Sequence, residues 1–233
     1  MQLRPRHLNT TVAALFVIGA AGFAVGSVPA YASAVGTLPD ALTFFIASLF
    51  FTSASFGQLV QSQSPTMTAT GTARDDEPQR VRWRAWLPHD RTWLAAATQF
   101  PGTLFFNATT LLALVQGLTA DQYDRVVWRP DFYGSVLFLV SSTFAILALG
   151  RFLTWRPRAA GWRIAWLNMA GSVAFMASAV AAYVLPRTGT AISPAWANGG
   201  TFVGAVCFFV GAWLMIPAFR PQAAAPAVTH GRT

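Results

Sequence analysis

Six long apolar blocks, separated by polar segments, set the pattern of the chain. They cover residues 11–31, 42–60, 94–115, 133–152, 164–185 and 197–218. At a rise of about 1.5 Å per helical residue, each block is long enough to cross the ~30 Å hydrocarbon core of a bilayer. Backbone amides find no water partners in lipid, so helices are the expected conformation. The pattern predicts an all-α integral membrane protein with six transmembrane helices.

The composition strengthens this prediction. Of the 233 residues, 54% are hydrophobic and 10% are charged, whereas about 25% of an ordinary soluble domain is charged. This excludes a typical soluble enzyme, a disordered chain and a fibrous protein. The net charge is +8, and all sixteen basic residues are Arg. Because they lie between the apolar blocks or at their ends, we expect the lipid bilayer and anionic lipid headgroups as partners, and no nucleic acid.

The arginines also predict the orientation in the membrane. Thirteen of the sixteen lie before the first block, between the second and third, between the fourth and fifth including Arg151, or after the sixth. The opposite side carries only Arg125, Arg129 and Arg187. The excess of basic residues marks the cytoplasmic side. We therefore expect a multi-pass protein of the cell (inner) membrane with both termini in the cytoplasm.

The first block has two interpretations. Arg4 and Arg6 precede it, and residues 28–32 (VPAYA) follow it, which also resembles a secretory signal with an A-x-A cleavage site. Cleavage there would leave five spans. We favour a retained span, because the block shares a motif with the others and has a neighbour with which to form a hairpin.

The blocks pair into hairpins along the chain. We expect helical hairpins at residues 1–60, 94–153 and 154–218. Residues 61–93 would form a cytoplasmic loop, and the Pro- and Ala-rich residues 219–233 a disordered tail. Within the loop, Arg alternates with Trp over residues 80–93. This suits a segment that binds anionic headgroups at the membrane surface; the alternative is an ordinary flank that anchors the third span.

Each block carries a short motif: a small residue, three positions, Phe, two positions, and a second small residue. Such residues share one helical face, and in lipid small residues let helices approach closely. We expect a Phe to fit over a neighbour's small residue. In the second block the motif falls on Ala41, Phe45 and Ser48, and in the first on Gly19, Phe23 and Gly26. The helix-packing residues expected in the other four blocks are Gly102, Phe106, Gly134, Phe138, Gly171, Phe175, Gly204 and Phe208.

The last two hairpins look duplicated. Residues 134–141 align without gaps with residues 204–211, and residues 102–106 align with 171–175. The Gly-x-x-x-Phe-x-x-Ser/Gly hairpins resemble the YrhK-like family of small bacterial membrane domains. The stretch WRPDFYGS at 128–135 is similar to one in uncharacterised, Arg-rich actinobacterial membrane proteins. The resemblance covers about residues 94–218 and implies membrane hairpins; the family has no established activity, so it implies no functional residues.

Few polar side chains lie within the blocks. Gln99 and Asn107 share the third block with Pro101. They could line a small site in a kinked helix, or form hydrogen bonds between helices, each contributing about 1 kcal/mol or less. Asp40 and Asp131 follow Pro39 and Pro130 at the starts of two spans, where we expect them to cap the helices.

No group of residues suggests catalysis. Cys207 is the only cysteine, the three His are scattered, and no matched nucleophile and base, metal-ligand cluster or nucleotide motif occurs. We expect no catalytic, cofactor-binding or metal-binding residue. The first hypothesis is a non-enzymatic structural or interaction module that pairs with a second copy or with another membrane protein. The alternative is a small transporter or channel for a neutral solute, because ion pathways usually contain charged residues within the membrane.

Overall fold

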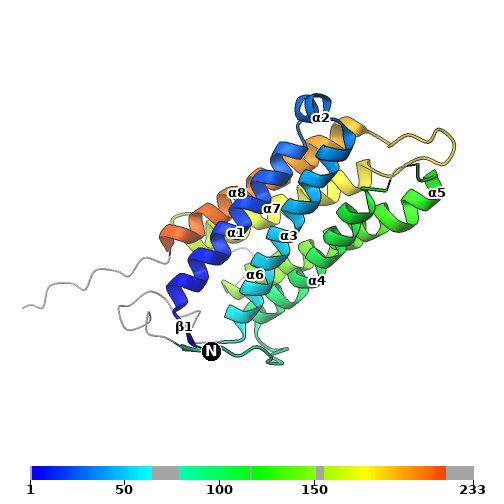
Figure 1. Cartoon of the computed structure of the whole chain (residues 1–233). Coiled ribbons are helices and arrows are strands. Elements are labelled where there is room, and N and C mark those ends of the chain that lie inside the picture. Colours follow the sequence, from blue (N-terminus) through cyan, green and yellow to red (C-terminus); the bar gives the residue numbers. More distant parts are fainter. Residues whose placement is uncertain (1, 65–78, 116, 151–154, 219–233) are drawn as a thin grey trace, which may run out of the picture.

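The computed structural model describes residues 2–64, 79–115, 117–150 and 155–218. Six long helices form most of it (Figure 1): α1 (Pro5–Gly26), α3 (Thr37–Ser62), α4 (Arg91–Leu112), α6 (Arg129–Ala148), α7 (Ala160–Ala181) and α8 (Pro194–Ala218). The short elements are α2 (Pro29–Val35), α5 (Ala120–Tyr123) and the π-helical turn η3 (Asp124–Trp128). β1 (Gln2–Leu3) pairs antiparallel with β2 (Gln79–Arg80). The predicted tail at 219–233 lies outside the described residues, as do residues 65–78 of the predicted cytoplasmic loop.

Five helical stretches are long and apolar enough to cross a membrane. They comprise α1, α3, the continuous stretch Ala120–Ala148 that ends in α6, α7, and most of α8. The prediction of a helical, membrane-embedded protein is confirmed at this level. The third apolar block is also helical, as α4, but α4 is not among the five. It contains Arg91, Gln99, Pro101 and Asn107, and the helix continues through the proline.

Each long helix begins three to six residues before the apolar block that predicted it. The first turn of a helix has free N–H groups, so it tolerates polar residues and proline. At the start of α4, for example, the Asp90 carboxylate accepts hydrogen bonds from the backbone N–H groups of Thr92 and Trp93 at 2.7 and 3.1 Å. Hydropathy alone does not detect a polar first turn. This is why the helices begin three to six residues before the predicted apolar blocks.

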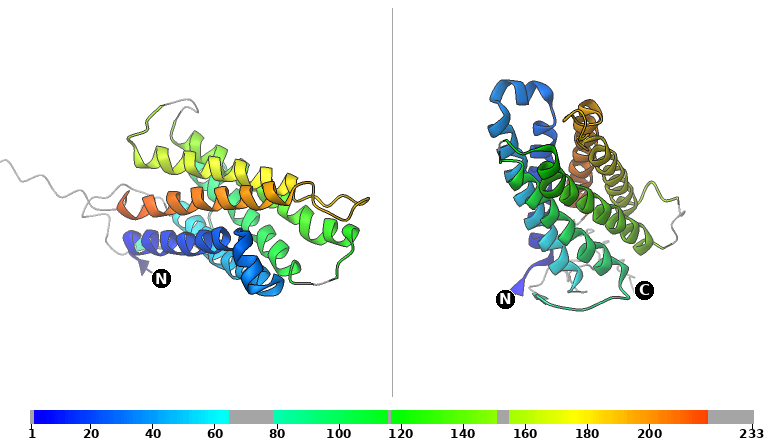
Figure 2. Two further views of the ribbon diagram at one scale, coloured as in Figure 1. Left: turned by 90° about the horizontal axis from the view of Figure 1, so that it is seen from above. Right: turned by 90° about the vertical axis from the view of Figure 1, so that its right-hand side faces the viewer.

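The six long helices form a closed ring in chain order. Each packs against the next, and α8 returns to pack against α1 (Figure 2). The closest pairs are α1 with α3, α4 with α6, and α7 with α8. The start of α1 and the end of α8 lie together, where the Asn9 side chain donates a hydrogen bond to the Met215 carbonyl at 3.2 Å. We call this end of the bundle the β1 end and the opposite end the α2 end.

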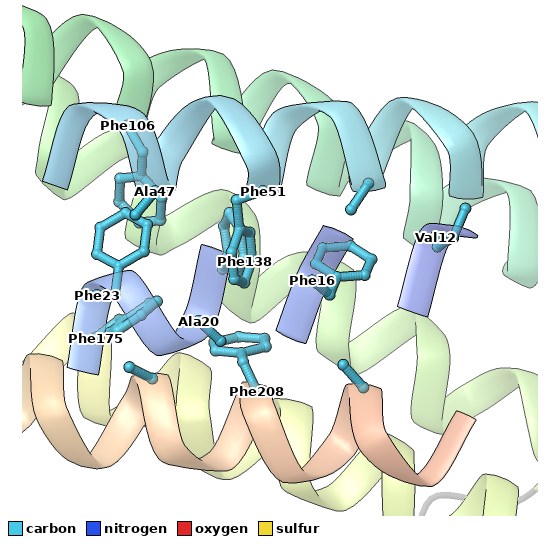
Figure 3. Packing of buried hydrophobic residues seen from close by; sticks show 13 residues of the cluster. Val12, Phe16, Ala20, Phe23, Ala47, Phe51, Phe106, Phe138, Phe175 and Phe208 are labelled. Atoms are coloured by element: carbon cyan, nitrogen blue, oxygen red, sulfur yellow. The ribbon is translucent and has the colours of Figure 1, made fainter. Parts of the chain in front are cut away.

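Buried phenylalanines occupy the middle of the ring, and every long helix contributes at least one (Figure 3). Six of them form the phenylalanine core, and a seventh, Phe16 of α1, lies beside it with its ring centroid 4.9 Å from that of Phe51. This phenylalanine core has two tiers. In the tier nearer the β1 end, all three rings contact one another, with centroids 5.6 to 6.1 Å apart: Phe51, Phe138 and Phe208. In the tier nearer the α2 end, Phe175 contacts its two neighbours at 6.1 and 5.8 Å: Phe23 and Phe106.

The phenylalanine core corrects the motif assigned to the second block. Phe45 is only half-buried, whereas Phe51 is 2% exposed and belongs to the core. The spacing recurs six residues further along, at Ala47, Phe51 and Ala54, and all three are buried. In a Phe-rich helix several positions satisfy so short a motif, and only the packing selects one.

Within each helix pair, a small residue of one helix lies against the core phenylalanine of the other. A Cβ atom at Gly102 would lie 3.0 Å from the Phe138 ring, and one at Gly134 would lie 2.8 Å from the Phe106 ring. Gly171 and Gly204 have the same relation to Phe208 and Phe175, and Gly19 to Phe51. These glycines leave no room for a side chain, so the helices approach closely at the level of the phenylalanine core.

Candidate binding cavities

Within the described residues, two cavities lie next to the phenylalanine core. The first has a volume of about 340 Å³ and lies on the β1 side of the core. Five of the six long helices line it, and α8 contributes no lining residue. Its polar wall is made of side-chain amides and hydroxyls, with small apolar residues between them. The amide residues are Asn9, Gln58, Gln61, Gln99 and Asn168. Among the residues that the structure describes, none that lines this amide cavity is charged.

Gln99 is held in the amide cavity by hydrogen bonds to two neighbouring helices. Its Nε2 donates to Oε1 of Gln58 on α3 at 3.2 Å. Its Oε1 accepts from the Ser141 hydroxyl of α6 at 3.3 Å, and the same hydroxyl donates to the Ala95 carbonyl at 2.8 Å. These contacts fix the Gln99 side chain where α3, α4 and α6 meet.

The opposite wall is built around Asn168 on α7, which the sequence analysis did not single out. The neighbouring Ser172 donates to the Asn168 backbone carbonyl at 2.8 Å and pairs with Ser142 of α6 at 2.8 Å. Asn168 follows Gln99 by the same 69 residues that separate Gly171 from Gly102. The internal alignment therefore contained a signal for this residue, because it puts an amide at equivalent positions of α4 and α7.

Asn107 does not line the amide cavity. Its Oδ1 accepts a hydrogen bond from the Thr52 hydroxyl at 3.1 Å, and that hydroxyl also contacts the Thr103 carbonyl at 3.3 Å. Asn107 thus connects α4 to α3. The structure does not bring Gln99 and Asn107 into one site, because eight residues along a helix separate them by about 12 Å.

A second, smaller cavity of about 40 Å³ lies on the α2 side of the phenylalanine core. Three core rings form one wall. The remaining lining residues are polar: Thr110, Asp131, Ser135, Ser178 and Thr201. We call this the Asp131 cavity.

The structure does not support the capping role expected for Asp40 and Asp131. The N-cap residues of α3 and α6 are Gly36 and Trp128, and neither helix has a side-chain cap hydrogen bond. Asp131 lies in the first turn of α6, already inside the helix, and lines the Asp131 cavity. An acidic residue that follows a proline can lie at the N-cap or inside the first turn of a helix, so the sequence alone did not distinguish these two positions.

The Arg- and Trp-rich segment runs along the β1 end. Trp83 stacks on Phe56 with ring centroids 6.3 Å apart, and Trp86 meets Trp93 edge to face at 5.3 Å. Trp86 nevertheless remains 80% exposed. Arg91 donates to the Leu147 carbonyl at 2.8 Å. Exposed indoles beside arginines at the end of an apolar bundle are typical of a membrane–water interface.

No family model matches the chain, and no curated protein or solved structure proved similar to it. The function is therefore inferred from the chemistry of the two cavities.

Proposed function

We propose that the chain is a multi-pass membrane protein that binds a small, neutral, hydrogen-bonding solute in the amide cavity, as part of a path across the membrane. The observation that carries this proposal is an uncharged, amide-lined cavity of about 340 Å³ inside a ring of apolar helices. This volume is at the small end of the range for ligand pockets.

The chemistry of the wall favours a neutral solute. A carboxamide offers donors and acceptors together, so Gln99, Gln58 and Asn168 can bind a solute that has both. An ion would lose its hydration shell without meeting a compensating charge, because the described lining residues are all neutral. A solute without hydrogen-bonding groups would leave the amides unpaired, which is also unfavourable.

We propose six spans, with α4 as the sixth. It packs in the ring between α3 and α6, and its polar side chains are used there: Gln99 in the amide cavity and Asn107 towards α3. With six spans and the Arg-rich segments inside, both termini are cytoplasmic in the inner membrane, and the amide cavity lies towards the cytoplasm. The phenylalanine core then separates it from the outer side.

We further propose that the three helix pairs are diverged repeats about an axis along the membrane normal. In all three pairs a glycine lies against a core phenylalanine of the partner helix, and in α4–α6 and α7–α8 this contact is reciprocal, which supports the proposal. Kinship with the YrhK-like family is also a proposal, and it is supported by the short sequence motifs alone.

A structural or interaction module is the second candidate, with a second copy or another membrane protein as partner. The phenylalanine core favours it, because such packing stabilises a bundle without any ligand. Neither candidate function requires enzymatic chemistry, a cofactor or a metal ion in the amide cavity.

Transport assays with purified protein in liposomes separate the two. Urea and glycerol are suitable neutral probes, and stopped-flow light scattering measures their entry. We expect faster entry of at least one probe than in protein-free liposomes, and loss of this gain in Gln99→Leu combined with Asn168→Leu. Asn198→Leu, at an exposed residue outside the cavity, is the matched control. If wild-type and empty liposomes behave alike with both probes, and neither probe raises the melting temperature, the structural module is favoured.

A further inference from the structure

We propose that the Asp131 cavity binds a single small monovalent cation, for which Na⁺ is the probe. This site lies on the other side of the phenylalanine core from the amide cavity and does not depend on solute binding there. Its volume of about 40 Å³ exceeds the ~10–15 Å³ that one water molecule requires. The cavity therefore has room for one ion of similar size.

The negative charge of the site comes from Asp131. It lies near the start of α6, within the continuous helical stretch Ala120–Ala148. The nearby arginines pair elsewhere: Arg125 with Asp121 at 2.9 Å and Arg129 with Asp124 at 2.8 Å. In the part of the chain that the structure describes, Asp131 forms no ion pair. A carboxylate that lines a largely apolar cavity without an ion-pair partner is stabilised by a counter-charge, and a bound cation supplies it.

Ser135 contributes a polar atom to the cavity that is unpaired in the part of the chain that the structure describes. It is 1% exposed and lines the cavity, four residues after Asp131 and therefore on the same face of α6. Its Oγ atom has no hydrogen-bond partner among the described residues. Buried polar atoms without partners are rare in folded proteins, and a bound water or ion is one of their ordinary explanations.

The other three hydroxyls of the cavity have hydrogen-bond partners within the protein. Thr110 donates to a carbonyl of its own helix at 2.8 Å, and its oxygen lies 2.9 Å from the Ser48 hydroxyl. The Ser178 and Thr201 hydroxyls lie 2.7 Å apart, so one donates to the other, and both lie within 3.0 Å of the Ala197 carbonyl. A hydroxyl oxygen has two lone pairs, so these side chains can still offer oxygen ligands to the cavity.

This set of ligands suits a monovalent ion. Carboxylate and hydroxyl oxygens are hard ligands that prefer hard cations over transition metals. Calcium sites usually combine six to eight oxygens, with several carboxylates among them. The Asp131 cavity has one carboxylate and four hydroxyl residues, which matches a single positive charge.

The test is Na⁺-dependent stability of the full chain in detergent. NaCl is titrated against choline chloride at constant ionic strength, with a parallel KCl series, and the melting temperature is recorded. We expect a saturable rise with Na⁺ that is absent with choline, and direct binding of radioactive ²²Na⁺. Both responses should be lost in Asp131→Asn.

Two further variants keep the test decisive. Ser135→Ala leaves the charge unchanged and should shift the Na⁺ response to higher concentration, even if Asp131→Asn does not fold. Asp121→Asn removes an exposed carboxylate at the same end of the bundle and should respond as the wild type does. Equal melting temperatures in NaCl, KCl and choline chloride, with no ²²Na⁺ bound, would mean that the cavity holds water only. Solute entry in liposomes is a separate measurement, so failure here leaves the amide cavity unaffected.

Discussion

The two cavities on either side of the phenylalanine core differ in size and in charge. The amide cavity is about 340 Å³ and its described lining is uncharged, whereas the Asp131 cavity is about 40 Å³ and contains a carboxylate. Both are built on the same ring of six helices, and two tiers of phenyl rings lie between them. The apolar centre is therefore the part that the three helix pairs share. The two ends of the bundle differ in chemistry because of polar residues that lie a few residues from the core phenylalanines along the same helices.

The phenylalanine core is the part whose loss should have the largest effect on both cavities. Phe138 is completely buried and contacts rings in both tiers. Replacing it with Ala should destabilise the protein by about 3–5 kcal/mol, because apolar contacts are lost and a void remains. Thermal unfolding in detergent measures this. Phe105→Ala, at a side chain 38% exposed, is the control and should change the melting temperature far less.

The next effect concerns the close approach of paired helices. Gly134→Leu places a side chain where the Phe106 ring lies 2.8 Å from the Cβ position. We expect a cost of about 1–3 kcal/mol and a lower melting temperature, because the helices must move apart. At Gly199 nothing lies within 4 Å, so Gly199→Leu tests the same change in open space. Equal melting temperatures for the two variants would contradict the packing described for the helix pairs.

A smaller effect is expected from the amide cavity. Gln99→Leu removes hydrogen bonds to Gln58 and Ser141, which should cost about 1 kcal/mol, a typical contribution for such bonds between membrane helices. Gln99→Leu should clearly slow the entry of solute while lowering the melting temperature only slightly. A variant with unchanged urea and glycerol entry and a reduced melting temperature would make Gln99 a packing residue only.

The smallest effect should come from the α3–α4 contact away from both cavities. Thr52→Val removes the hydrogen bond to Asn107 and should reduce stability by about 0.6 kcal/mol. Solute entry and the Na⁺ response should stay as in the wild type. A loss of solute entry in this variant would show that the path runs past Asn107, in conflict with the position of the amide cavity.

The parts of the structure that the sequence predicted are those governed by local rules. The helical blocks follow from hydropathy, whereas the exact starts, such as the one at Asp90, lie a few residues before the predicted blocks. The register of the motif in α3 was predicted at Phe45, because spacing alone cannot distinguish it from Phe51. Asp131 was expected to cap a helix because it follows a proline, but in the structure it lines a cavity.

The candidate sites were harder to predict than the helices. Gln99 was singled out as a polar residue in an apolar block, but two other amides of the cavity, Gln58 and Asn168, lie on other helices, 41 residues before it and 69 after it. Asn107 is also a polar residue in that apolar block, but it contacts Thr52 of α3 and lies outside the amide cavity. Periodicity indicates which residues share a helical face, but not which face of another helix it meets.

The amino-acid sequence by itself determined that this chain forms long apolar helices, since unpaired backbone amides are too costly in lipid for another conformation. The tertiary structure alone decided which phenylalanines meet, that the amides gather on one side of them, and that Asp131 and Ser135 line one cavity on the other. The physical reason is distance along the chain. Hydropathy and capping act within a few residues, whereas both cavities exist only once helices separated by as many as two hundred residues close into a ring.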